Sequence, residues 1–254
     1  MICDDAKSVG TRDVARDEAR AVGCLAPQSW ERASQRLPVW PFLSLGAVGL
    51  SLIPWDGPIS GWARSIRLGG DLKRELEVAQ QFGDLLCLVL TATLIWLLDP
   101  RRRGLIWLGA GGISCALLTS TIAKTVIGRP RPKFGSPALL GPWRTYDVGG
   151  HFGSRYAWEV WSGAWTDLTS MPSSHTVAAA ALAAFLSRAY PSLRGLSIVL
   201  AVVVGIARVM FGAHYLSDVL IGGATGWYAG TFGMMLTERL ARWHAARYRV
   251  SILQ

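Results

Sequence analysis

Apolar residues in this chain are concentrated in six blocks of about 20 residues, with no amphipathic helix or strand period within them. An α-helix of that length rises about 30 Å, which matches the hydrocarbon thickness of a bilayer. The pattern therefore predicts an all-α membrane protein, a bundle of six transmembrane helices. The blocks are 39–55, 82–98, 104–122, 172–190, 195–213 and 215–236.

Polar segments at both ends divide the chain further. Residues 1–38 carry six acidic and six basic side chains and little apolar periodicity, which predicts a polar N-terminal tail. Because the first apolar run begins near residue 39, we do not expect a cleaved signal peptide. The predicted organisation is thus a tail (1–38), a six-span domain (39–236) and a basic C-terminal tail (237–254).

Composition supports a membrane protein and narrows its partners. Hydrophobic residues make up 51% of the chain and charged residues 17%, whereas soluble domains are about one quarter charged. The net charge of +9 suits anionic membranes, phosphate-bearing substrates or nucleic acid. Many basic residues flank apolar blocks, so we expect membrane lipids and no nucleic acid as partners. The four cysteines lack metal-type spacing, which predicts no metal site and no disulfide framework.

Loop charge and loop length set the expected orientation. Residues 101–103, between the second and third blocks, are three arginines in a short turn, which favours the cytoplasmic side. Both termini then lie in the cytoplasm. The long segment 124–171 lies on the other face, and its many tryptophans and tyrosines predict a structured cap at the membrane interface.

Three polar clusters flank the predicted spans, at 124–132, 172–175 and 208–218. The first two border the same loop, and the third follows two crossings later. All three therefore share one membrane face, whichever way the protein is oriented. Because ionisable groups at span ends are costly to place, such a gathering commonly marks a functional site.

The clusters contain the side chains that a phosphate site needs. Lys124, Arg131 and Arg208 can neutralise a phosphate dianion, the two arginines through forked hydrogen bonds. Ser173 and Ser174 follow a proline in a pattern typical of a helix start, where free N–H groups suit phosphate oxygens.

Two histidines add the groups for covalent catalysis. His214 and Asp218 are four residues apart, so on a helix the carboxylate can orient the imidazole as a nucleophile. His175, from a different helix, can then protonate the leaving oxygen. Arg208 lies six residues before His214, so a helix break near Gly212 is required to bring both to one site.

In these motifs the chain resembles the type 2 phosphatidic acid phosphatase (PAP2) superfamily, whose pattern is K-x6-R-P, P-S-G-H and S-R-x5-H-x3-D. Here the pattern is Lys124-x6-Arg131-Pro132, Pro172-Ser173-Ser174-His175 and Ala207-Arg208-x5-His214-x3-Asp218. Two positions depart from it: Ser174 replaces the usual glycine and Ala207 the usual serine. Neither departure removes a group that makes or breaks a bond, although either could alter substrate choice.

The resemblance implies a metal-independent phosphatase that needs no cofactor. It assigns phosphate binding to Lys124, Arg131, Ser173, Ser174 and Arg208. It also implies that His214 attacks phosphorus, Asp218 orients it, and His175 protonates the leaving group. Water then releases phosphate from a phosphohistidine.

The expected substrate is a lipid phosphate or pyrophosphate in a bacterial inner membrane, cleaved on the periplasmic face. Candidates are a polyprenyl pyrophosphate, phosphatidate, phosphatidylglycerol phosphate and the 1-phosphate of lipid A. One alternative is a phosphotransferase that passes phosphate to a second lipid alcohol, and another is a catalytically silent lipid-binding or transport protein. The sequence leaves the oligomeric state open.

Overall fold

Each of the six apolar blocks contributes a helix in the computed structural model, which describes residues 40–150 and 152–252, the last five by backbone only. The predicted tail 1–38 lies outside the described residues. The mostly helical fold is therefore confirmed. The six helices are α3 (Trp40–Ser51), α6 (Leu85–Leu98), α7 (Leu105–Ile127), α9 (Ser174–Ala189), α10 (Arg194–Met210) and α11 (Leu216–Ile252).

Two further helices lie between α3 and α6, where the apolar pattern predicted none. They are α4 (Asp56–Ser65) and α5 (Gly70–Ala79). The chain bends by 49° between α3 and α4, and by 62° where α5 meets α6. Short 3-10 helices join the longer elements: η1 (Ile53–Trp55), η2 (Gln80–Gly83), η3 (Pro100–Arg102), η4 (Pro132–Phe134) and η5 (Pro191–Leu193).

Among the described residues, two helices are long and apolar enough to cross a membrane, or up to four if each bent pair is one span. The two are Leu105–Ile127 and Pro191–Met210. α9 has only 16 residues, and the first turns of α11 are rich in glycine and polar groups. The expected count of six spans therefore stays a prediction.

The core of the bundle forms around α9, whose residues are almost all buried against α7, α10 and α11. Small side chains permit this close packing. A Cβ added at Gly226 of α11 would lie 2.2 Å from the Val177 carbonyl oxygen, and one at Gly230 would lie 3.0 Å from the Ala181 Cβ. The Gly-x-x-x-Gly spacing therefore serves helix contact within the bundle.

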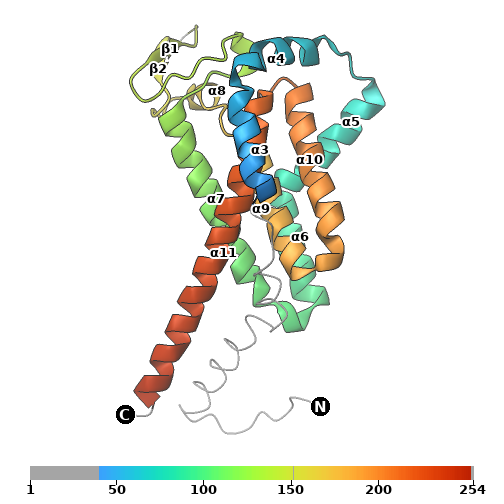
Figure 1. Ribbon diagram of the computed structural model, residues 1–254, viewed down its shortest axis with the longest axis vertical. Helices are drawn as coiled ribbons and strands as arrows, with labels where there is room; N and C mark the ends of the chain where they lie inside the picture. Colours follow the sequence, from blue (N-terminus) through green and yellow to red (C-terminus); the bar gives the residue numbers. More distant parts are fainter. Residues whose placement is uncertain (1–39, 151, 253–254) are drawn as a thin grey trace.

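α11 continues as one helix as far as Ile252, so most of the predicted basic C-terminal tail is helical. The division at residue 236 has no counterpart in the backbone, and a separate tail stays a prediction. Figure 1 shows the C-terminal end of α11 extending beyond the other helices of the bundle.

The segment between α7 and α9 forms a structured cap. Strands β1 (Thr145–Asp147) and β2 (Ser154–Tyr156) pair antiparallel, with Thr145 opposite Tyr156. The short helix α8 (Trp165–Leu168) follows. Leu140, Ala157 and Leu168 form a small apolar core beneath the hairpin. Figure 1 shows the cap, α4, the end of α7 and the start of α11 at the same end of the bundle.

Candidate active site

The connection between α10 and α11 brings Arg208 and His214 to the same end of the bundle. α10 ends at Met210, and Gly212 adopts a φ of 62°, a left-handed conformation that favours glycine. The N–H groups of Ala213 and His214 both donate to the Arg208 carbonyl oxygen, at 3.1 and 3.2 Å. The helix break that the spacing required is therefore present.

The imidazole of His214 is buried, with 2% of the residue exposed. Its Nδ1 lies 2.8 Å from the Ser170 carbonyl oxygen, which can only accept a hydrogen bond. Nδ1 therefore carries the proton, and Nε2 carries a lone pair. The nearer Asp218 oxygen is 3.7 Å from Nδ1, so the direct partner is Ser170 and not the aspartate that the spacing suggested. Ser170 also donates its hydroxyl to Asp218 at 2.6 Å, which links all three residues.

Burial also fixes the protonation state of His214, which lies in the connection between two helices. It lowers the pKa of His214 to about 4 from an ordinary value of about 6.5. The neutral, nucleophilic form is thus present above about pH 4 and is lost as the pH falls through that value. The unfolded chain binds this proton near pH 6.5, about its ordinary value, whereas the folded protein binds it only near pH 4. The free energy of unfolding therefore decreases as pH falls from about 6.5 to about 4.

We therefore expect His214 to titrate with a midpoint near pH 4. NMR of protein with isotopically labelled histidine checks this, with His214→Gln identifying the signal. A midpoint close to the ordinary value of about 6.5 would contradict the buried environment.

Asp218 lies in a buried network centred on Arg129. Asp56, Arg129 and Asp218 are all 0% exposed. Arg129 donates one Nη to Asp218 at 2.6 Å and the other to Asp56 at 2.7 Å. Ser217 accepts from Arg129 at 2.8 Å and donates its hydroxyl to Asp56. The motif pattern includes Arg129 as an unspecified position, and nothing in it points to Asp56, the first residue of a helix that the sequence did not predict.

The three predicted phosphate-binding cations are held by acceptors that leave N–H groups available. Lys124, in the last turn of α7, donates to the Thr169 carbonyl oxygen at 2.6 Å. The Nε of Arg131 donates to the Thr166 carbonyl oxygen at 2.7 Å. Arg208 donates one Nη to the Gln80 side chain at 3.0 Å. Arg131 and Arg208 both lie close enough to Lys124 to act on it electrostatically.

The start of α9 closes the site. Ser173 is the residue before the helix, and its N–H donates to the Asp218 carbonyl oxygen at 3.1 Å. Ser174 is the first helical residue, so it contributes to the free N–H groups of the helix N-terminus. His175 follows, with its Nε2 3.2 Å from the carboxylate of Asp84. Arg208, Arg131 and Lys124 all act electrostatically on His175.

The structure thus gathers all eight predicted site residues at one end of the bundle. Lys124 and Arg131 act electrostatically on both histidines, which links the three motifs directly. A region with three cations, a helix N-terminus and an imidazole lone pair can bind a phosphate and attack its phosphorus. Among residues 40–150 and 152–252, no group of His, Cys, Asp or Glu side chains is arranged to hold a metal ion.

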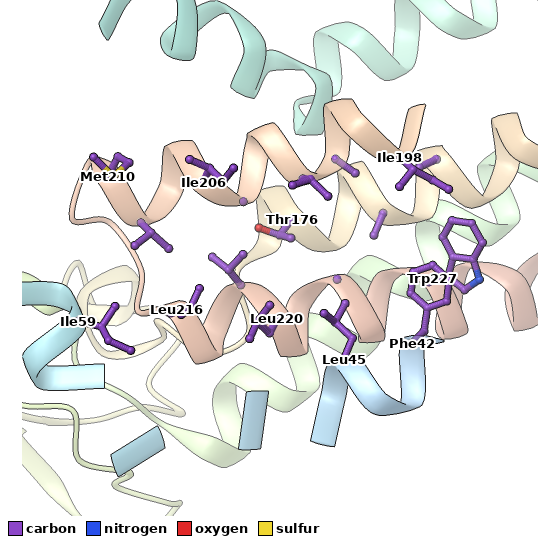
Figure 2. Close-up of a pocket in the computed structure, with 18 of the residues that line it drawn as sticks. Phe42, Leu45, Ile59, Thr176, Ile198, Ile206, Met210, Leu216, Leu220 and Trp227 are labelled. Carbon is purple, nitrogen blue, oxygen red and sulfur yellow. The ribbon is translucent and has the colours of Figure 1, made fainter. Parts of the chain in front are cut away.

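An apolar groove of about 430 Å³ runs between α3, α4, α9, α10 and α11. Thr176 and Val209, the neighbours of His175 and Arg208, line it. Figure 2 shows Met210 and Ile59 at one end of the groove and Trp227 and Phe42 at the other. The rings of Phe42 and Trp227 stack with centroids 4.0 Å apart. The groove therefore provides an apolar surface that reaches the residues next in sequence to His175 and Arg208.

Curated relatives share most of the length of this chain. It is 28% identical over 232 residues to a lipid A 1-phosphatase of Rhizobium johnstonii, covering 83% of this chain and 87% of that protein. It is 27% identical over 206 residues to a lipid A 1-phosphatase of Rhizobium etli, covering 74% and 80%.

Two crystal structures have a similar fold. One is a transmembrane PAP2-type phosphatidylglycerolphosphate phosphatase from Bacillus subtilis, with a TM-score of 0.52, 25% identity, and coverage of 78% of this chain and 92% of that one. The other is LpxE of Aquifex aeolicus, with a TM-score of 0.50, 17% identity, and coverage of 70% and 93%.

The apolar helices and the transmembrane relative indicate an integral membrane protein. Residues 104–242, more than half of the chain, match the PAP2 superfamily. The chain therefore belongs to the PAP2 superfamily and is a phosphatase of its lipid phosphatase group.

Proposed function

We propose that this protein hydrolyses the phosphate ester of a membrane lipid through a phosphohistidine on His214, with a lipid A 1-phosphate as the favoured substrate. The observation that carries the proposal is the geometry of His214. Ser170 holds its Nδ1–H, and the Nε2 lone pair belongs to a ring on which Lys124 and Arg131 act electrostatically.

In the proposed reaction Nε2 of His214 attacks phosphorus, and the bond from phosphorus to the leaving oxygen breaks. The imidazolium of His175 gives its proton to that oxygen. Lys124, Arg131, Arg208 and the N–H groups at the start of α9 stabilise the charge on the phosphoryl oxygens. Water then attacks the phosphohistidine and passes a proton back to His175, which releases phosphate and restores both histidines.

The lipid part of the proposal is supported by the groove beside the site. Its walls are apolar and lie between helices that we propose to span the membrane six times, so one acyl chain of the substrate can occupy it. Residues 99–104 join α6 to α7 at the end of the bundle away from the cap, as Figure 1 shows. With the arginines of that turn in the cytoplasm, the site faces the periplasm of a bacterial inner membrane.

Narrowing the groove should therefore weaken binding of long-chain substrates. Ala201 lines the groove, and Ala201→Phe is expected to reduce kcat/KM for a long-chain lipid phosphate by about tenfold. Losing burial of two methylenes at about 0.8 kcal/mol each accounts for this loss. Steady-state kinetics with long-chain and short-chain phosphates provide the measurement.

The matched control is Leu196→Phe on the same helix, because Leu196 is exposed and lies outside the groove lining. Equal losses for both chain lengths, or the same loss in the control, would show that the groove does not hold the lipid.

Phosphate release by purified protein from a panel of lipid phosphates in EDTA tests the function itself. We expect the fastest release from a lipid A 1-phosphate, because two lipid A 1-phosphatases align with most of the chain. Faster release from phosphatidylglycerol phosphate would assign the activity of the Bacillus subtilis relative instead. Loss of activity in EDTA, with recovery on adding a metal, would contradict the mechanism.

A further inference from the structure

The break between α5 and α6 lies directly against the first turn of α9. The chain bends by 62° there, and a Cβ added at Gly83 would lie 2.3 Å from the His175 carbonyl oxygen. A side chain at residue 83 would therefore push the break away from α9. Gln80, in the same break, accepts the hydrogen bond from Arg208. The break thus supports two residues of the candidate active site.

Asp84 occupies the position before the first residue of α6, where an aspartate usually accepts a hydrogen bond from the helix N–H groups. Its side chain makes no such capping bond. Its carboxylate lies 3.2 Å from Nε2 of His175 instead, and the Asp84 side chain is 40% exposed. Helix capping therefore does not account for the direction of this carboxylate.

The charged groups around His175 explain why a carboxylate is needed. Arg208 from α10, Arg131 from the segment after α7, Lys124 from α7 and Asp84 from the α5–α6 break all act on the ring. The three cations oppose a positive charge on His175, whereas a general acid must carry that charge before it gives up its proton. Asp84 is the group whose negative charge offsets the effect of these three cations on His175.

We propose that Asp84 positions His175 as the general acid, an inference that rests on the proposed phosphatase function. Asp84 accepts the Nε2–H bond of His175, which leaves Nδ1–H to protonate the leaving oxygen. When the bond from phosphorus to oxygen breaks, the Nδ1 proton moves to that oxygen and the ring becomes neutral, with Nε2–H still held by Asp84. Water attacking the phosphohistidine then returns a proton to Nδ1.

The two histidines are thus held in opposite ways. The Ser170 carbonyl oxygen lies 2.8 Å from Nδ1 of His214 and leaves Nε2 as the nucleophile. The Asp84 carboxylate lies 3.2 Å from Nε2 of His175, which in the proposal leaves Nδ1 for proton transfer. Each ring is oriented by an acceptor that the sequence motifs do not contain.

The test compares two phosphate monoesters with the same alkyl chain, one a simple alkyl phosphate and the other an alkyl-substituted nitrophenyl phosphate. The alkoxide needs a proton as it leaves, whereas the nitrophenolate leaves without one. Asp84→Asn is expected to lower kcat/KM by about 10- to 100-fold for the alkyl ester, and by less than about threefold for the nitrophenyl ester. The value of kcat/KM depends only on the steps up to release of the first product. It therefore isolates the step in which His175 acts as an acid.

A double-mutant cycle provides a second test of whether Asp84 acts through His175. With His175→Ala already present, Asp84→Asn should lower kcat/KM for the alkyl ester no further, because Asp84 acts through His175. The matched control is Asp71→Asn, an exposed carboxylate in the first turn of α5, which should leave both esters unaffected.

Equal losses on both esters, or an additive loss in the double variant, would show that Asp84 has only a structural role. Either result would overturn the assignment of Asp84 and leave the proposed phosphatase function standing. If the wild-type protein releases phosphate from neither ester, nor from any lipid phosphate, the proposed function fails and this inference fails with it.

Discussion

Replacing His214 by alanine is expected to lower phosphate release from a lipid phosphate by about 10⁴-fold or more. The reason is that no other group takes over the attack on phosphorus when the imidazole lone pair is gone. Lys124, Arg131 and Arg208 still bind the phosphate in this variant, so KM should change much less than kcat. Single-turnover phosphate release by the purified variant provides the measurement.

His244→Ala is the matched control, since His244 lies in the distal half of α11. Both variants should keep the thermal unfolding midpoint of the wild-type protein within a few degrees. An His214→Ala protein that is folded and retains more than about one tenth of the activity would exclude the phosphohistidine pathway.

Arg129→Ala is expected to have the largest effect on stability. The change leaves Asp56 and Asp218 buried without the guanidinium that pairs with both. Removing one partner of a buried ion pair costs about 3–5 kcal/mol, and here two carboxylates are affected. Because Asp218 also holds Ser170, and Ser170 holds His214, phosphatase activity should fall as well.

Denaturant unfolding of the detergent-solubilised protein measures this cost. Arg144→Ala, at an exposed position in the cap, serves as the control and should change the free energy of unfolding by less than about 0.5 kcal/mol. A change below about 1 kcal/mol in Arg129→Ala would show that the network contributes little and that the two carboxylates find other partners.

The helices and the shared end of the three motifs could be predicted because both follow from properties of the chain alone. Runs of apolar residues indicate helices of membrane length, and the number of crossings determines which loops share a face. The bend at Gly212 was also predictable, since Arg208 and His214 could not otherwise reach one site.

The partners of the site residues could not be predicted, because they come from segments with no membrane-type pattern. Asp84 lies at the bend of 62°, and Asp56 begins the helix that follows the bend of 49°. The direction of a chain after such a bend depends on packing against other helices. Ser170 contacts His214 through a main-chain carbonyl, which every residue has, so this contact leaves no trace in the residue type. The count of six spans stays a prediction for a related reason: α9 is surrounded by protein and does not need the hydropathy of a lipid-facing helix.

Locating the phosphoryl group during turnover is the strongest test of the proposed phosphohistidine mechanism. Protein reacted with a radiolabelled lipid phosphate can be quenched within one turnover at alkaline pH, digested, and mapped by mass spectrometry. From the proposed phosphohistidine mechanism we expect label on the peptide that contains His214, and on the imidazole itself. Label on any other residue would contradict it, as would transfer of phosphate directly to water with inversion of configuration at phosphorus.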